Sequence, residues 1–361
     1  MAGIGKRSKA AMKEIKRAQQ ARALARYYTL HSILGNPCPF YIVIGGRKTG
    51  KSYSVAEFLC KHQDDKNYWM RISETSTKAM LGNNCKGMID PDLVRKYDMD
   101  LKAKGGMYVE NHGKEFVTVA PLSAFGKLKG VGFYDKDYDG WYNIVLDEFQ
   151  LEQGEKRTSF DILYNFIGMC ENTVRTEKGK VRVFLLGNTL EEASTILKAF
   201  NFLPEKFGRF YIHKWNKNTK KRELVAVLDN LEPTEEYLAD RYGSIADILG
   251  GDSMSNYTNE LSRDTELIYK GRRIRPTGII KFTKKHVDWY TMWDDGVICK
   301  YNGEQLKEGS SYTMRPYIDD TFSKQKKQLI LDLYDARVLR FKDLVTQSYF
   351  QDELTKIRKT A

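Results

Sequence analysis

The sequence lacks the features of a membrane or secreted protein. Its 361 residues contain no apolar run of about 18 residues, the length that a membrane-spanning helix needs. The N-terminus has no apolar core of the kind found in secretion signals. We therefore expect no membrane span and no export.

Cysteine is also scarce, and its spacing excludes two kinds of small scaffold. The five cysteines form no C-x-x-C pair and no zinc-type spacing, so neither a disulfide framework nor a zinc module is expected. Reduced, partly buried thiols of an intracellular protein fit this pattern. The positions are Cys38, Cys60, Cys85, Cys170 and Cys299.

Acidic residues are outnumbered, 47 against 59 lysines and arginines, which gives a net charge of +12. An excess of this size fits a polyanionic partner. Residues 1–26 hold one acid, Glu14, and eight basic residues (Lys6, Arg7, Lys9, Lys13, Lys16, Arg17, Arg22 and Arg26). This stretch is either a basic helix that touches nucleic acid or a solvated tail.

The stretch from Tyr41 to Phe58, YIVIGGRKTGKSYSVAEF, predicts a phosphate-binding loop between a buried strand and a helix. It completes the pattern G-x-x-x-x-G-K-[ST], in which glycines let backbone N–H groups point at phosphate oxygens. The lysine would reach the β- and γ-phosphates of ATP, and the serine hydroxyl would ligate Mg²⁺. The predicted nucleotide-binding residues are Gly45, Gly46, Arg47, Lys48, Thr49, Gly50, Lys51 and Ser52.

A second motif, YNIVLDEFQ at residues 142–150, places two carboxylates after an apolar strand. We expect Asp147 to hold the Mg²⁺ ion and Glu148 to act as the general base that polarises the attacking water. The glutamate favours the additional-strand class of P-loop ATPases. Two further strand ends predict nucleotide contacts, at Arg71 and at Asn188. Arg71 could instead be a surface arginine, and Asn188 a helix cap.

The intervening segments predict a hairpin at 107–110 and 115–119, and then a basic loop over 120–133. A helix is expected over 158–172, with Phe160, Leu163, Phe166 and Ile167 facing inward. Strands are expected at 67–72, 181–186, 207–212 and 223–228. Candidate DNA contacts are Lys127, Lys129 and the basic run from Lys217 to Arg222.

Four segments are predicted along the chain: a basic extension at 1–34, an ATPase domain at 35–229, a helical linker at 230–262 and a C-terminal α+β domain at 263–361. In the last, strands are expected at 278–282, 287–292, 296–301 and 311–317, and helices at 324–333 and 341–357. Its carboxylates could hold two metals for nuclease work. However, Asp294-Asp295-Gly296 is also a strong turn signal. The carboxylates considered are Asp288, Asp294, Asp295, Asp319 and Asp320.

Taken in order, VIGGRKTGKSY, WMRIS, APLS, IVLDEF and the strand ending in GN resemble the genome-packaging ATPases of small Bacillus-type podophages, which are related to large terminases. The resemblance covers most of residues 38–230, and only the combination of motifs is specific. The C-terminal third matches poorly.

The resemblance implies a homomeric ring, typically a pentamer, that pumps double-stranded DNA into a procapsid with ATP. It implies docking on a portal and a structural RNA, in the host cell cytoplasm, and a C-terminal domain similar to an RNase H-like nuclease that has lost its metal site. It further implies two basic residues that act on the neighbouring subunit, Arg175 as arginine finger and Lys129 as the second. Arg157 is the alternative finger.

Three rival functions stay open on the sequence. The chain could be another ring ATPase, such as a helicase or a transfer motor. It could be a terminase with an active nuclease. It could also be a nucleic-acid-binding scaffold with a degenerate nucleotide site, although Lys51, Asp147 and Glu148 argue against that.

Overall fold

The structure is a computed structural model. It describes residues 27–46, 49–85, 87–129, 133–149, 160–175, 179–188, 194–233, 239, 242–244, 248, 265–271, 276–280, 290–293, 297–300 and 324–360. Contacts divide the chain into two units, residues 1–196 with 206–262, and residues 197–205 with 263–361. No helix in these ranges is long and apolar enough to cross a membrane.

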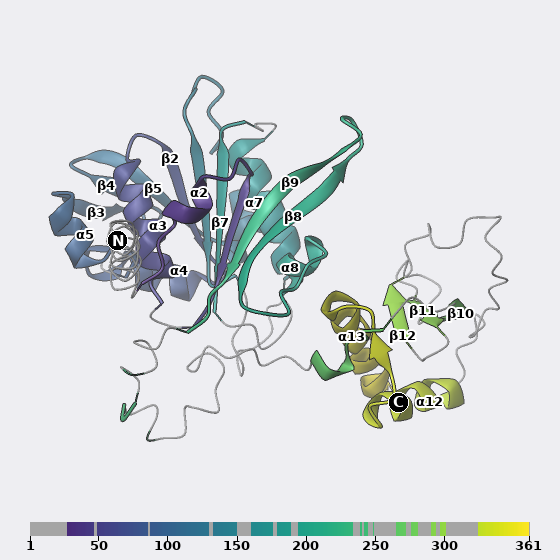
Figure 1. Cartoon of the computed structure of the whole chain (residues 1–361). Coiled ribbons are helices and arrows are strands. Elements are labelled where there is room, and N and C mark those ends of the chain that lie inside the picture. Colours follow the sequence, from purple (N-terminus) through teal and green to yellow (C-terminus); the bar gives the residue numbers. More distant parts are fainter. Residues whose placement is uncertain are drawn as a thin grey trace, which may run out of the picture. The chain divides into compact units, whose positions relative to one another are not determined.

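The first unit is built on a mixed sheet of nine strands (Figure 1). Six central strands run parallel, whereas the edge strands β3, β4 and β8 are antiparallel to their neighbours. In spatial order the strands are β3 (Leu101–Lys104), β4 (Tyr108–Asn111), β5 (Lys114–Pro121), β2 (Lys66–Arg71), β6 (Tyr142–Asp147), β7 (Val181–Gly187), β1 (Phe40–Ile44), β9 (Lys221–Asn230) and β8 (Gly208–Asn216).

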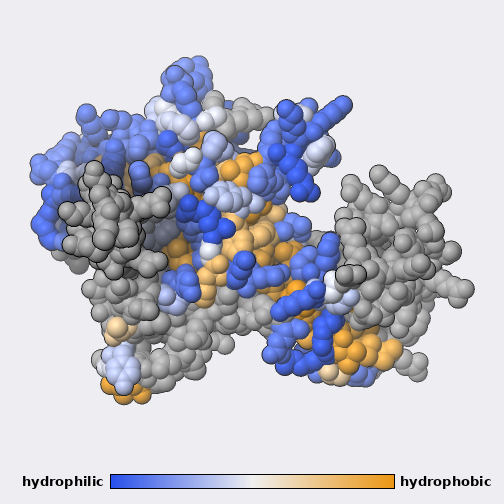
Figure 2. Space-filling view, viewed as in Figure 1, coloured by the Kyte–Doolittle hydropathy of each residue, from blue (hydrophilic) through white to orange (hydrophobic). Residues whose placement is uncertain are grey.

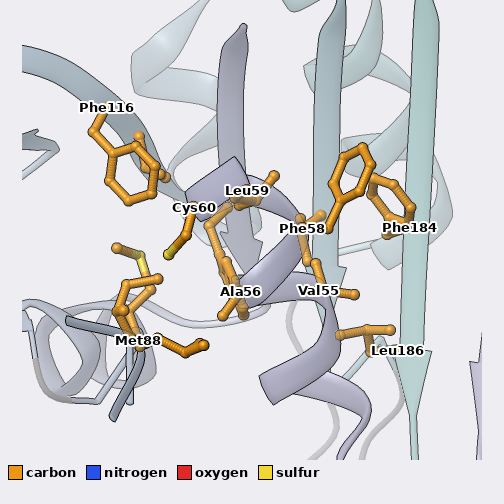
Figure 3. Close-up of a cluster of buried hydrophobic side chains, with 14 of the residues drawn as sticks. Val55, Ala56, Phe58, Leu59, Cys60, Met88, Phe116, Phe184 and Leu186 are labelled. Carbon is orange, nitrogen blue, oxygen red and sulfur yellow. The ribbon is translucent and has the colours of Figure 1, made fainter. Parts of the chain in front are cut away.

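Helices cover both faces of this sheet, which explains why its central strands are apolar at nearly every position. Helices α3 (Lys51–Lys61), α4 (Glu74–Cys85) and α5 (Pro91–Lys96) share one core with alternate strand residues (Figure 3). Helix α7 (Ile162–Val174) lies on the other face (Figure 1). Each of the large side chains buried here contributes about 1.5–3 kcal/mol, so the sheet is a rigid base for the loops at its edge.

Short elements complete the first unit: α2 (His31–Leu34), the 3₁₀ turn η1 (Leu122–Ala124) and α6 (Phe125–Leu128). Helix α8 (Thr195–Ala199) begins in the first unit and ends in the second.

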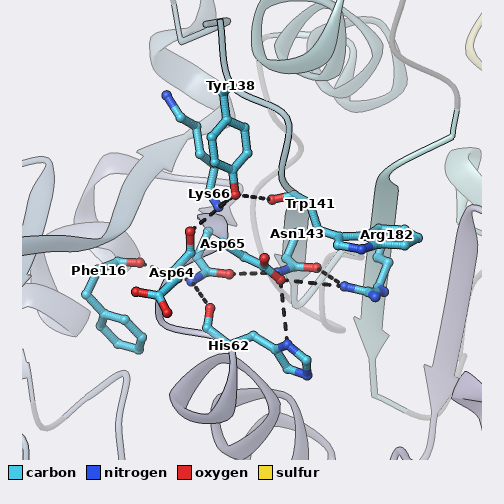
Figure 4. Close-up of polar contacts among 10 residues, drawn as sticks. His62, Asp64, Asp65, Lys66, Phe116, Tyr138, Trp141, Asn143 and Arg182 are labelled. Carbon is cyan, nitrogen blue, oxygen red and sulfur yellow. Dashed lines mark hydrogen bonds and ion pairs between the residues drawn. The ribbon is translucent and has the colours of Figure 1, made fainter.

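A buried polar network closes the end of the sheet where the parallel strands begin (Figure 4). The Asn143 amide, fully buried in β6, donates to Asp65 and Asn67, and its oxygen accepts from Arg182. The Arg182 guanidinium stacks 3.6 Å from the centre of the Trp141 ring. A buried amide costs free energy unless it is bonded, so the network fixes the strand register at this end.

The second unit contains a four-stranded sheet in the order β10 (Pro276–Ile280), β11 (Tyr290–Trp293), β12 (Val297–Lys300) and β13 (Arg340–Phe341). The first three strands are antiparallel, and β13 runs parallel to β12. Two helices, α12 (Lys324–Asp335) and α13 (Leu344–Thr360), and the 3₁₀ turn η3 (Thr265–Leu267) accompany the sheet. Phe341 and Phe350 are fully buried between β13 and α13, 5.5 Å apart.

The structure corrects several expectations from the sequence. Residues 122–128 are helical within the segment expected to be a loop. Ile167, expected to face inward, is exposed, whereas Phe166 and Met169 are buried. Strands β8 and β9 extend into most of the run expected to connect them.

The hairpin β4–β5 and the expected strands β2, β7, β10, β11 and β12 are present, with ends shifted by up to a few residues. The fourth expected C-terminal strand, 311–317, lies outside the described residues, as does most of the linker segment. So do the carboxylates Asp288, Asp294, Asp295, Asp319 and Asp320. Within the described ranges, no group of three His, Cys, Asp or Glu residues is placed to hold a metal.

Candidate nucleotide and metal site

The site lies at the carboxyl edge of the parallel strands, where β1, β6 and β7 end. The loop after β1 turns into α3 at Gly50, whose φ of 88° is a left-handed conformation that favours glycine. A Cβ at this position would come within 2.8 Å of Tyr27 Cβ. Helix α3 begins directly after it, so the positive end of the helix dipole points into the loop.

Lys51 is buried, and its ammonium lies within the loop that it follows. Its Nζ donates to the carbonyl oxygens of Gly45 and Gly46, at 2.8 and 2.7 Å, and to Thr49 Oγ1 at 3.2 Å. These acceptors replace water around the charge, as burial of an ammonium requires. The lysine therefore holds the loop in a curled conformation, with its charge at the helix start.

The two motifs meet at Ser52 and Asp147. Ser52 Oγ donates to Asp147 Oδ1 over 3.2 Å, although the residues are 95 positions apart. A hydroxyl oxygen and a carboxylate oxygen are ligands of the kind that Mg²⁺ prefers. The donor set therefore fits the predicted metal ligands Ser52 and Asp147.

Arg71, at the end of β2, contacts both carboxylates. Its Nη2 donates to Asp147 Oδ2 at 2.8 Å, and its Nη1 forms an ion pair with Glu148 Oε2. Its buried Nε has no hydrogen-bond partner among the described residues. The two oxygens of Asp147 are thus divided between Ser52 and Arg71.

Burial raises the pKa of Asp147, while the charge of Arg71 opposes that rise and Glu148 adds to it. Glu148 follows the last residue of β6 with a φ of 55°, a left-handed conformation that is uncommon for a residue with a side chain. The strand direction changes at this residue, and Phe149 then returns to the core.

A cavity of about 380 Å³ lies between the two motifs, a volume within the range of small-molecule sites. The predicted residues that line it are Thr49, Gly50, Lys51, Ser52, Asp147, Glu148 and Asn188. Tyr53, Leu186 and Gly187 also line it and were not predicted. Tyr53 directly follows the motif serine, but no pattern in the sequence marks it as a site residue.

Residues 27–30 brace the loop from outside the predicted motif. Tyr28 N donates to Thr49 O at 2.8 Å, and Leu30 N donates to Ser54 Oγ at 2.7 Å. The Tyr28 hydroxyl donates to Asp229, which is also bonded by Arg209 through two nitrogens. Sequence reasoning missed this brace because its contacts are long-range and follow no motif.

The two predicted trans-acting residues do not line the cavity. Arg175 is exposed at the end of α7, with its guanidinium 5.3 Å from the centre of the Tyr134 ring. Lys129 is exposed after α6 and lies 4.9 Å from the centre of the Phe125 ring. Arg47, Lys48 and Arg157 lie outside the described residues.

Two solved structures share this architecture across nearly the whole chain. The DNA packaging motor gp11 of Phi-28 has 15% identity and a TM-score of 0.56, and covers 91% of this chain and 98% of its own. The viral genome packaging motor assembly of bacteriophage Phi-29 has 17% identity and a TM-score of 0.58, over 92% and 99%. The fold is that of phage DNA-packaging motors. Compared by sequence, the chain matches no family model and no curated protein.

The structural likeness confirms the sequence resemblance to genome-packaging ATPases at the level of the fold. It extends to the C-terminal third, where the sequence motifs match poorly. At such low identity the likeness shows the fold alone, so the activity has to be argued from the site.

Proposed function

We propose that this protein is an ATPase that moves double-stranded DNA into a viral procapsid. The observation that carries the proposal is the meeting of Ser52 and Asp147 beside the Lys51 loop, at one cavity. The matched packaging-motor folds support the choice of genome packaging over the helicase and transfer-motor alternatives.

The strand order supports assignment to the additional-strand class of P-loop ATPases. Strand β7 lies between β1, which carries the loop, and β6, which carries Asp147 and Glu148. This inserted strand separates the two motifs and brings Asn188 to the cavity between them. The division of the chain at residue 263 supports the start of the last predicted segment, and we keep the vestigial RNase H-like nuclease as the proposed nature of that segment.

In this proposal, Gly45 to Ser52 and Asn188 bind ATP, and Ser52 and Asp147 hold Mg²⁺. The metal would neutralise charge on the transferred phosphate. Glu148 takes a proton from the attacking water, and its ion pair with Arg71 at Oε2 orients the carboxylate. Arg71 is therefore a positioning residue for both carboxylates, in addition to its predicted contact with the nucleotide.

The placement of Arg175 and Lys129 outside the cavity fits a ring of copies. Within one subunit neither side chain lines the nucleotide site, so each could act on a neighbour's site. We propose a homomeric ring, pentameric by resemblance, that assembles with a portal and a structural RNA. Its grip on DNA would be mainly to phosphates, and hence salt-sensitive.

ATP hydrolysis tests the proposal, measured with and without double-stranded DNA. We expect DNA to stimulate turnover in the wild type, and we expect Glu148→Gln and Arg175→Ala each to be inactive alone. Mixing the two variants should restore part of the activity, because an intact site can then form between unlike subunits. Lys114→Ala, an exposed change on β5, is the control.

If Arg175→Ala keeps full DNA-stimulated activity, the finger assignment is wrong and Arg157 is tested next. If the wild type shows no hydrolysis, portal particles are added. Continued absence of hydrolysis would then favour a nucleic-acid-binding scaffold. Metal-dependent nicking of plasmid DNA would support a terminase with an active nuclease instead.

A further inference from the structure

The hairpin β8–β9 continues beyond the sheet as a two-stranded ribbon. Strand β9 pairs with β1 only from Ala226 to Asn230, whereas its pairing with β8 continues to Lys221. Figure 1 shows the ribbon extending away from the remaining strands. A two-stranded ribbon gains little stability by itself, so its length is not explained by the fold of the unit.

One face of the ribbon presents an exposed aromatic side chain next to a cation. Trp215 is 61% exposed, and its partner in the register across the ribbon is Arg222. His213 lies two residues along the same strand, also exposed, so it shares this face. Tryptophan is usually well buried, and the cost of leaving this indole in water suggests a partner that covers it.

The surroundings of Trp215 are strongly basic. Between residues 213 and 223 the chain has five cations (Lys214, Lys217, Lys220, Lys221 and Arg222) and one carboxylate, Glu223. The Glu223 oxygens accept hydrogen bonds from Asn216 and Thr219, which places this carboxylate in the structure of the turn. In Figure 2 the projecting hairpin is coloured largely hydrophilic.

Hydrogen bonds within the turn stabilise the tip of the ribbon. Asn216 Oδ1 accepts from the backbone N–H groups of Asn218 and Thr219, at 2.9 and 3.3 Å. Lys220 adopts a left-handed φ of 54° that returns the chain to β9. Because the turn is already ordered, binding would cost little conformational entropy.

We propose that this ribbon binds a single-stranded segment of nucleic acid. A base stacks on the Trp215 indole, and phosphates contact Arg222 on the same face and Lys220 at the turn. An aromatic platform inside a basic surface is the combination that single-strand-binding proteins use. A duplex keeps its base faces stacked on one another, so it would satisfy the cations and leave the indole exposed.

The proposed binding site on the ribbon is separate from the nucleotide site of the proposed translocase. The ribbon contributes no residue to the nucleotide cavity, and its ligand has unpaired bases, unlike the double-stranded DNA cargo. Loss of single-strand binding with retained ATP hydrolysis would therefore concern the ribbon alone. RNA and DNA segments offer the same two chemical features, a base face and a phosphate chain, and both are used as probes.

Fluorescence anisotropy of the full chain tests the proposal. The probes are labelled oligothymidylate and oligouridylate of about ten nucleotides, within the range that single-strand-binding modules cover, and a duplex of equal length. We expect Trp215→Ala to weaken binding of the single strands about tenfold and to leave duplex binding unchanged. Trp215→Phe, which keeps an aromatic face, should retain most of the affinity. Tyr242→Ala, at an 88% exposed aromatic outside the ribbon, is the matched control.

The cations are tested by the salt dependence of binding. The double change Lys220→Ala with Arg222→Ala should reduce the slope of log affinity against log salt by about 1.4, since each single-strand phosphate contact contributes about 0.7. Lys102→Ala with Lys104→Ala removes the same charge from the exposed strand β3 and should leave the slope unchanged.

Preference for one single strand over the other would identify the natural ligand as RNA or DNA. The proposal is overturned if Trp215→Ala binds single strands as well as the wild type does. It is also overturned if Trp215→Ala weakens duplex binding as much as single-strand binding. A third contrary result is that Trp215→Ala weakens only the binding of polyglutamate, the probe for an acidic protein surface. Thermal unfolding of each variant checks that the fold is kept.

Discussion

Arg71 Nη2 and Asp147 Oδ2 form an ion pair of 2.8 Å between the ends of two neighbouring strands. The second guanidinium nitrogen binds Glu148, so one side chain holds both carboxylates of the proposed catalytic pair. Because Ser52 contacts the other Asp147 oxygen, the pair leaves the proposed metal-binding side of Asp147 free of Arg71.

Replacement of Arg71 should impair both carboxylates. Arg71→Ala removes the charge that lowers the pKa of Asp147, so burial will raise that pKa further. We expect ATP turnover to fall about 10–100-fold, as for other residues that orient metal ligands. Binding of Mg²⁺-ATP should also require a higher pH than in the wild type.

Isothermal titration of Mg²⁺-ATP over a pH series measures the second effect. Arg71→Lys keeps the charge but cannot bind both carboxylates in the same way. We expect its pH dependence of Mg²⁺-ATP binding to lie close to that of the wild type, and its ATP turnover to stay low. A pH profile of Arg71→Ala that overlays the wild type would contradict the assigned role.

Asp147 is expected to destabilise the protein when it carries no ligand. Its pKa is raised in the folded state, so the folded chain binds the proton more tightly than the unfolded chain does. Its contribution to stability is complete below the ordinary aspartate pKa of about 4 and is lost as the pH rises through the raised value. Asp147→Asn keeps the shape without the charge.

We therefore expect the stability of Asp147→Asn relative to the wild type to increase as the pH rises above about 4. Urea unfolding at several pH values measures this difference. The variant should also lose stabilisation by Mg²⁺-ATP. If the stability difference between the variant and the wild type is the same at every pH, burial does not raise the pKa of the Asp147 carboxyl.

Two glycines form a matched pair for the phosphate loop. Gly50→Ala places a Cβ 2.8 Å from Tyr27 Cβ at a left-handed φ, so it should destabilise the protein by more than about 1 kcal/mol. Gly82→Ala, inside α4 with nothing within 4 Å of the new Cβ, should stabilise it by about 0.5–1 kcal/mol.

Thermal unfolding of both variants, together with titration by an ATP analogue, measures these effects. Gly50→Ala should also bind the nucleotide less well, whereas Gly82→Ala should bind normally. Equal stability changes for the two glycines would remove the argument that Gly50 fixes the loop.

A buried lysine in the last turn of α8 contacts α13 within the second unit. Lys198 Nζ lies 2.5 Å from Asp352 Oδ2 and 5.0 Å from the centre of the Tyr349 ring, and its side chain is only 6% exposed. Asp352→Ala would leave the ammonium buried without its carboxylate, at a cost of about 2 kcal/mol, given that Asp352 itself is half exposed.

Lys198→Met keeps the length and the apolar stem, so it should cost less than Asp352→Ala. Hydrogen exchange of α13 in the two variants reports on this unit without relying on activity. If Lys198→Met loosened α13 more than Asp352→Ala did, the packing of the stem, and not the buried charge, would be the larger contribution.

The local patterns of the chain predicted most of the parallel sheet and the two motifs of the site. Apolar runs such as Tyr41–Ile44 specify strands that are buried on both faces, and the glycines of the loop specify a backbone that few other residues adopt. The segment at residues 158–172 predicted a helix, which is observed over 162–174, and Phe166 faces inward as expected whereas Ile167 does not. Ile167 is exposed because the packing of neighbouring elements decides which side of a helix is covered.

By itself the sequence determined the residue types of the nucleotide site, because each chemical role restricts the side chain at a fixed spacing. Only the tertiary structure decided that Arg71 holds Asp147 and Glu148, that residues 27–30 brace the loop, and that Trp215 lies exposed opposite Arg222. These contacts join positions that are far apart or that depend on strand register. They follow from the order and register of the strands, which no local pattern of residues encodes.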